Sequence, residues 1–204
     1  MKFAAMFSSL MLAASFAAQP AGGDLPAVES DWLTYANQDP GWLCWEGILR
    51  ATWFNVEDFY SGSAEWELQK VAIWFTHSSE LPWDTSQFYT EVWSGDQSGP
   101  QQLVDQTLTT ALSGTPTIVE YPTLLSPGSD FWVVISTEFS AGGWPSNFCD
   151  SGSTQTIPHS FNSDDFVNWN AWEPGGELAN YMIQILPVVE ALDPLSWAAL
   201  KKVF

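Results

Sequence analysis

The two cysteines of this 204-residue chain are its most reactive side chains. Cys44 and Cys149 lie roughly 100 residues apart, and the entropy model assigns a disulfide across such a loop about 4–5 kcal/mol. The features of an exported protein, described below, favour a disulfide because thiols are oxidised outside the cytoplasm. Two buried thiols are the alternative. A cysteine zinc site is excluded because no second Cys or His lies at ligand spacing. We therefore expect a Cys44–Cys149 disulfide.

Histidines and carboxylates offer little support for catalysis. His77 and His159 each lie at the edge of a predicted strand, where a lone histidine is more often a hydrogen-bonded surface residue than a general base. The sequence contains neither a G-x-S-x-G nucleophile motif nor an H-E-x-x-H zinc motif. A glycoside hydrolase requires two carboxylates about 5–10 Å apart in a cleft, and sequence does not give that separation. We expect a protein that is not an enzyme, and a glycoside hydrolase is an alternative.

Side-chain oxygens gather in one predicted loop. Asn162, Asp164 and Asp165 together offer the hard oxygen ligands that Ca²⁺ prefers, although their spacing is not that of an EF-hand. A solvated turn rich in Asn and Asp is the alternative, because these side chains also bond their own backbone. The three residues are therefore our candidate calcium ligands, and calcium is the only candidate cofactor.

Tryptophans beside amides form a second candidate site. Trp144 lies in a Gly-Gly-Trp-Pro loop, where strand alternation gives it no core-facing position. Trp169 and Trp172 lie near Asn168 and Asn170, which could hydrogen-bond a sugar stacked on an indole ring. Packing against the core or its rim is the alternative for each tryptophan. These five residues are the candidate ligand-binding set, with a glycan as the ligand.

Short runs of alternating apolar residues, separated by turn signals, must position these side chains. Gln87–Trp93 is typical, with Phe88, Thr90 and Val92 alternating against Tyr89, Glu91 and Trp93. The other predicted strands lie within 44–55, 65–76, 102–108, 117–121, 130–137, 156–161, 166–172 and 179–186. Eight or nine strands without a helical run among them predict an all-β fold, an antiparallel sandwich resembling a jelly roll, over residues 43–187.

The two ends of the chain differ from this middle. Residues 1–18 have the Lys2 charge, the apolar run and the small-x-small site of a secretory signal peptide, and no later segment is long enough to span a membrane. Residues 19–42 form a lead-in segment rich in Gly, Pro, Asp and Asn. In the tail, 188–204, Pro194 and the spacing of Trp197, Leu200 and Phe204 predict a short helix. The sequence therefore predicts a secreted protein.

Net charge narrows the possible partners. The chain has 24 acidic and 5 basic residues, a formal net charge of −19, and only 14% charged residues against 46% hydrophobic ones. The hydrophobic content excludes a disordered chain, and the missing basic surface excludes a nucleic-acid partner. Most carboxylates lack an ion-pair partner, which indicates screening by salt or by bound cations.

Several of these segments resemble a family of β-sandwich accessory domains found in large secreted bacterial proteins. The resemblance rests on the strand Phe88–Trp93, the turn Gly95–Pro100, the G-x-x-F-W-V run at Gly128–Val133 and the closing strand at Tyr181–Ile183. The ending Ser196–Phe204 is similar to the short Trp…Lys tails of such proteins. The resemblance implies a non-catalytic module at the cell surface or in the extracellular matrix, and it transfers no catalytic residue.

Two non-catalytic functions therefore stay open beside the alternative of a glycoside hydrolase. The first is an exported, non-catalytic surface or matrix module that could act by self-association. The alternative is a carbohydrate-binding module that uses Trp144, Trp169 and Trp172.

Overall fold

The structure is a computed structural model of the chain, and it describes residues 32–37, 39–45, 48–60, 66–80, 82–151 and 155–189. The predicted signal peptide, the first part of the lead-in segment and the predicted helix of the tail lie outside these residues. Within them the chain forms strands and two short 3-10 helices, Val56–Asp58 and Pro174–Gly176, and no α-helix.

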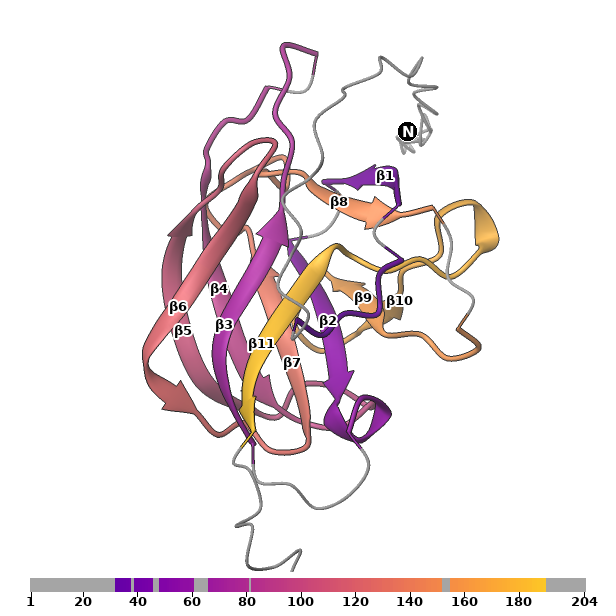
Figure 1. Ribbon diagram of the computed structural model, residues 1–204. Coiled ribbons are helices and arrows are strands. Elements are labelled where there is room, and N and C mark those ends of the chain that lie inside the picture. The colour runs from indigo at the N-terminus through magenta and orange to yellow at the C-terminus, as the bar shows by residue number, and fades with distance from the viewer. Residues whose placement is uncertain are drawn as a thin grey trace, which may run out of the picture.

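Eleven strands make up the described part of the fold (Figure 1). They are β1 (Pro40–Cys44), β2 (Leu49–Asn55), β3 (Trp66–Trp74), β4 (Gln87–Ser94), β5 (Gln102–Thr110), β6 (Pro116–Leu125), β7 (Asp130–Ser136), β8 (Asn147–Asp150), β9 (Ser160–Ser163), β10 (Asn170–Ala171) and β11 (Ile183–Val189). Six form one antiparallel sheet in the order β10-β9-β2-β7-β4-β5, and three form a second in the order β11-β3-β6. The chain crosses between these sheets after β2, β3, β5, β6 and β10. The predicted all-β sandwich is confirmed.

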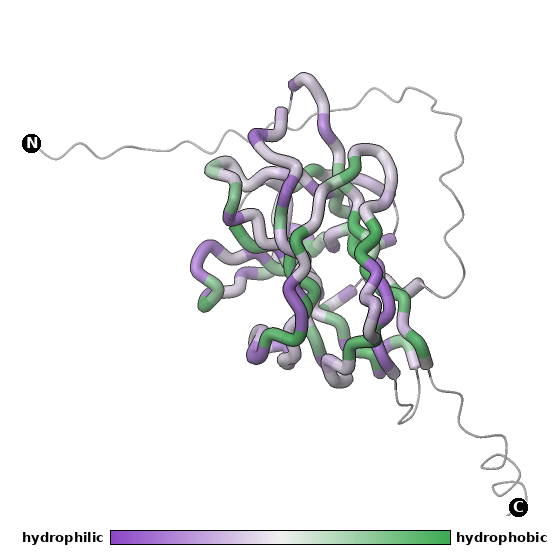
Figure 2. Tube along the Cα trace, turned by 90° about the vertical axis from the view of Figure 1, so that its left-hand side faces the viewer, coloured by the Kyte–Doolittle hydropathy of each residue, from purple (hydrophilic) through white to green (hydrophobic). Residues whose placement is uncertain are grey.

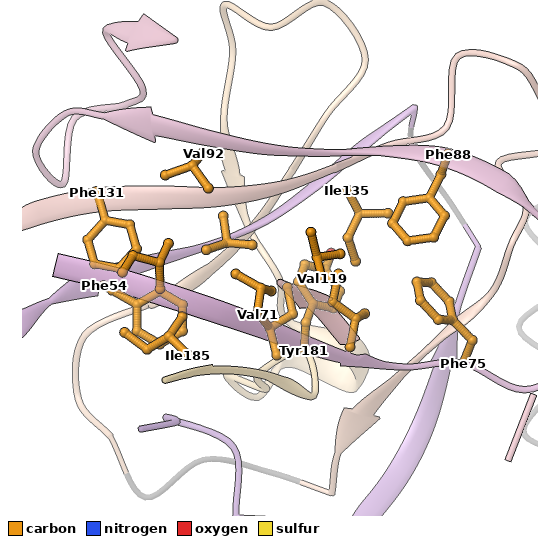
Figure 3. Packing of buried hydrophobic residues seen from close by; sticks show 14 of the residues in the cluster. Phe54, Val71, Phe75, Phe88, Val92, Val119, Phe131, Ile135, Tyr181 and Ile185 are labelled. Atoms are coloured by element: carbon orange, nitrogen blue, oxygen red, sulfur yellow. The ribbon is translucent and has the colours of Figure 1, made fainter. Parts of the chain in front are cut away.

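The main core lies between the two sheets, and strand alternation explains its composition. Figure 3 shows Phe88 and Val92 of β4 and Phe131 of β7 facing Val71 of β3 and Ile185 of β11. All five side chains are fully buried. They are the inward half of period-2 patterns, because successive strand residues point to opposite faces. The strand and the alternation predicted for Gln87–Trp93 are therefore present, and Phe88 and Val92 lie on its core face.

The turn after β4 shows why a glycine is needed there. Gly95 has a φ of +150°, and a Cβ at this position would lie 2.4 Å from the carbonyl oxygen of Gly99. The Gly99 N–H in turn donates to the Asp96 carbonyl oxygen at 3.0 Å. The predicted turn over Gly95–Pro100 is present and joins β4 to β5.

Part of the predicted lead-in segment belongs to the fold. The Leu33 N–H donates to the Ile185 carbonyl oxygen at 2.9 Å, and the Ile185 N–H returns a bond to Leu33 at 3.0 Å, so this segment pairs along the edge of β11. Residues 40–44 pair with β8 as a separate two-stranded ribbon, seen beside the sandwich in Figure 1.

The strand prediction is wrong in the region before β11. The predicted strand over 166–172 is only Asn170–Ala171, because the preceding residues form a tight loop in which Phe166 has a φ of +62°. The predicted strand over 156–161 begins only at Ser160. Neither difference changes the fold class, but together they turn this region into a cover for the six-stranded sheet.

Candidate functional site

The two cysteines are not joined by a disulfide, so that prediction is wrong. Both are buried in the main core, and the Cys44 Sγ lies 3.8 Å from the Tyr181 hydroxyl oxygen. Burial raises the pKa of the Cys149 thiol well above its usual value, which keeps it protonated and unreactive. The prediction relied on the exported character of the chain and on the separation of the two cysteines. In the structure the pairing of β1 with β8 holds these two segments together without a disulfide.

Arg50 is a buried cation that no sequence motif marked. Its side chain is fully buried, and it donates from Nη1 to the Cys44 carbonyl oxygen at 2.6 Å and from Nη2 to the Pro145 carbonyl oxygen at 2.8 Å. The one ion pair found among the described residues is elsewhere, between Lys70 and Glu120. Arg50 therefore ties the end of β1 and the loop before β8 to β2, which is a structural role.

The two histidines have different environments. His77 is exposed, and its backbone N–H donates to Ser113 Oγ. His159 is buried, contrary to the expectation of a surface residue, because its ring lies between Tyr35 at 3.5 Å and Trp53 at 5.0 Å between centroids. Burial lowers the pKa of His159, so its imidazole is neutral at pH 7. Its Nδ1 lies 3.2 Å from the Trp53 carbonyl oxygen, which engages it in the fold.

Asn162 lies in β9 and Asp164 and Asp165 lie in the loop between β9 and β10, where the Asp165 oxygens are used locally. The Asp165 carboxylate accepts bonds from the backbone N–H groups of Val167 at 2.9 Å and Asn168 at 2.8 Å, and from the Asn168 amide at 2.6 Å. These bonds lower the pKa of Asp165 to about 2. Asn162 pairs with Asn170 across β9 and β10, and Asp164 is exposed. The hydrogen bonds favour the alternative of an Asx-rich turn.

The same loop holds part of the candidate glycan site, since Asn168 and Trp169 lie three and four residues after Asp165. Trp169 is half-buried, with its ring centroid 5.3 Å from that of Trp132, and its indole nitrogen is buried. Trp172 is also half-buried and stacks on Tyr181 of the main core at 5.8 Å. Both contacts favour a packing role for Trp169 and Trp172 over sugar binding.

Trp144 lies apart from that loop. Its ring stacks on Trp45 with centroids 5.8 Å apart and an interplanar angle of 22°, so one face of the indole is already covered. Its backbone N–H donates to Ser140 Oγ at 2.9 Å. The structure therefore does not bring Trp144 together with Trp169 and Trp172 through any contact among the described residues.

The outer face of the six-stranded sheet, opposite the main core, carries the second group of aromatic residues. Cross-strand pairing places its side chains in rows, one of which joins Trp53, Trp132 and Trp93. Over β2, β7 and β9 this face is a second core, in which Trp132, Val134 and Phe161 are buried. The loop 164–169 lies over it through Phe166 and Trp169. We call this part of the sheet the covered half.

The strands β4 and β5 carry the remaining part of the same face, which we call the open half. Tyr89 pairs with Leu108 across the two strands, and the Phe139 ring lies 4.9 Å from the Tyr89 ring. Phe139 is 46% exposed and Leu108 is 53% exposed. Figure 2 views the molecule from the side on which β5 and β6 lie. These two strands are edge strands, one of each sheet. The open half is the candidate site.

A buried carboxylate lies where the open half meets the covered half. Glu91 is only 5% exposed, and its oxygens accept bonds from the Trp93 indole N–H at 2.7 Å and the Gln106 amide at 2.8 Å. These bonds fix the Gln106 amide at the surface beside the aromatic rings. Alternation in the sequence set Tyr89, Glu91 and Trp93 on one face of the strand, but it did not tell which face is outward or whether an outward residue is covered.

Comparison with profiles of known protein families, with curated proteins and with solved structures finds no match for this chain. Among the described residues, no group of three or more His, Cys, Asp or Glu side chains is arranged to hold a metal ion. The described part of the chain also lacks a helix of the length and hydropathy that a membrane span requires.

Proposed function

We propose that this protein is an exported β-sandwich module that acts at the cell surface or in the extracellular matrix by binding rather than by catalysis. The observation that carries the proposal is the open half, where large apolar side chains stay exposed on a sheet whose other half is covered. Exposed apolar surface costs free energy in water, and contiguous patches of it usually mark interaction sites.

The use of the reactive side chains supports the same proposal. His159, Arg50 and the two cysteines hold loops and strands in place through contacts within the fold. The sequence features of an exported chain supply the location, and the acidic composition suits a setting in which salt screens the carboxylates.

Export is tested by expressing the tagged full chain in an exporting bacterial host. We expect a processed protein outside the cytoplasm, with an N-terminus near Gln19, that external protease degrades on intact cells or that is recovered in the medium. A chain lacking residues 1–18 is the matched control and should stay in the cytoplasm. An unprocessed cytoplasmic full-length protein would contradict the proposal.

A further inference from the structure

We propose that the open half binds a neutral polysaccharide, with the rings of Tyr89 and Phe139 packing against a sugar ring. This inference rests on the proposed function and names its ligand class. The site differs from the tryptophan set expected from the sequence, because it lies on β4, β5 and the turn after β7.

Phe139 is exposed on a turn that hydrogen bonds hold in place. The Thr137 N–H donates to the Ile48 carbonyl oxygen at 2.8 Å, and the Ser140 N–H donates to the Thr137 carbonyl oxygen at 2.9 Å. The Ser140 hydroxyl donates to Asp84 at 2.9 Å and accepts from the Trp144 N–H. An apolar ring presented on a fixed turn is preorganised, so binding costs little conformational entropy.

The rings of Tyr89 and Phe139 lie against each other in a tilted arrangement. The planes of the Tyr89 and Phe139 rings are tilted by 47° and their centroids are 4.9 Å apart, so the two rings are not stacked in parallel. Sugar rings have an apolar face of C–H groups, which is attracted to the electron-rich face of an aromatic ring. Leu108, paired with Tyr89 on β5, extends this apolar surface.

Polar groups lie beside the two rings, namely the Gln106 amide and the Tyr89 hydroxyl. Glu91 holds the Gln106 amide through one N–H, and the described residues give the Gln106 carbonyl oxygen and the Tyr89 hydroxyl no hydrogen-bond partner. Both groups stay available to sugar hydroxyls. A binding surface of flat aromatic rings with a few fixed polar groups is the pattern that gives both affinity and orientation.

Charge selects among glycans. The chain has a formal net charge of −19, and the turn that carries Phe139 also carries the exposed Glu138. A polysaccharide of uronic acids or sulfated sugars would be repelled by this field. A neutral polysaccharide is not repelled. The side chains of the site and the charge of the protein therefore both favour a neutral glycan as the ligand.

The test is native gel electrophoresis of the full chain in gels that contain one soluble glycan each. The strong negative charge makes the protein migrate well without a ligand. The probes are hydroxyethylcellulose, xylan, galactomannan and glycogen, with alginate as the anionic comparison. We expect at least one neutral glycan to retard the protein and alginate to leave it unaffected. Phe139→Ala and Tyr89→Ala should each weaken the binding about tenfold, as expected for the loss of one stacked ring.

The matched control is Trp42→Ala, which removes an aromatic side chain that is 39% exposed on β1, away from the open half. It should bind as the unchanged protein does, and all variants should keep the unfolding temperature within a few degrees. Failure of every neutral glycan to retard the protein would overturn the proposal. Loss of binding in Trp144→Ala but not in Phe139→Ala would also overturn it. An exported protein that binds no glycan contradicts only this inference, whereas a binding protein that is not exported contradicts only the proposed function.

Discussion

The covered and open halves of the six-stranded sheet start from the same sequence pattern and end in different environments. Both present large apolar side chains on outward positions of β-strands, Trp132 in the covered half and Tyr89 in the open half. Trp132 is fully buried, whereas Phe139, which packs on Tyr89, is nearly half exposed. A covering loop such as 164–169, and not the strand itself, therefore decides whether an outward aromatic residue stabilises the fold or stays free to bind.

The cover has a local cause. Ser163 and Asp165 accept hydrogen bonds from the backbone of the residues that follow them, and Phe166 adopts a positive φ, so the loop 164–169 turns back onto the sheet. No comparable loop follows β5, because the residues after Thr110 lead directly to β6 in the other sheet. The open half is open because its strands are joined by short connections.

The largest effect is expected for Trp132→Ala, in the covered half. The substitution removes a fully buried indole and its hydrogen bond to the Asp96 carbonyl oxygen. We expect the free energy of unfolding to fall by about 3–5 kcal/mol. Chemical denaturation of the purified protein measures this change. A loss below about 1 kcal/mol would mean that the covered half is not a core.

Glu91→Gln tests the boundary between the halves. The amide has only one acceptor oxygen, so either the Trp93 indole N–H or the Gln106 amide loses its partner. We expect a loss of about 1–3 kcal/mol in the free energy of unfolding, measured by denaturation, since one buried donor stays unsatisfied. Glu120→Gln, on the exposed face of β6, is the control and should change stability little. Equal effects of the two substitutions would contradict the buried position of Glu91.

His159 sets a pH dependence for the covered half, where it stacks on Trp53. Burial lowers its pKa in the folded state, so the unfolded chain binds a proton more readily. The stabilisation is present above the unfolded pKa of about 6.5 and is lost as the pH falls through the lower folded pKa. Thermal unfolding followed between pH 7.5 and 5 should show this decrease, and it should be smaller in His159→Phe, which keeps a ring in the stack. An identical dependence of stability on pH in both proteins would contradict the assignment of this pH dependence to His159.

The smallest effect on stability is expected in the open half. Phe139→Ala removes an exposed ring from a turn held by backbone bonds, so the free energy of unfolding should change by no more than about 0.5 kcal/mol. Denaturation compared with Trp132→Ala gives the contrast directly. A loss similar to that of Trp132→Ala would make Phe139 a core residue and remove the distinction between the halves.

The sequence predicts the fold class and the main core, because both follow from period-2 alternation in runs such as Gln87–Trp93. It does not predict the cover, because Phe166–Trp172 alternates like a strand but the bonds to Asp165 turn it into a loop. It also misses the unbonded state of the cysteines and the burial of His159, since both depend on contacts between segments far apart in the chain. Alternation placed Tyr89 on the face opposite Phe88 and Val92, but the structure was needed to show which of the two faces is outward.

Hydrogen exchange of the full chain, with and without the neutral glycan that binds most tightly, tests the division of this face most directly. We predict that the glycan slows exchange in β4, in β5 and in residues 137–140, because these segments carry Tyr89, Leu108 and Phe139. Exchange in residues 160–172, which include β9 and the loop that lies over the covered half, should not change. Slower exchange confined to residues 160–172 would contradict the account, because it would place the ligand on the loop that packs as a cover.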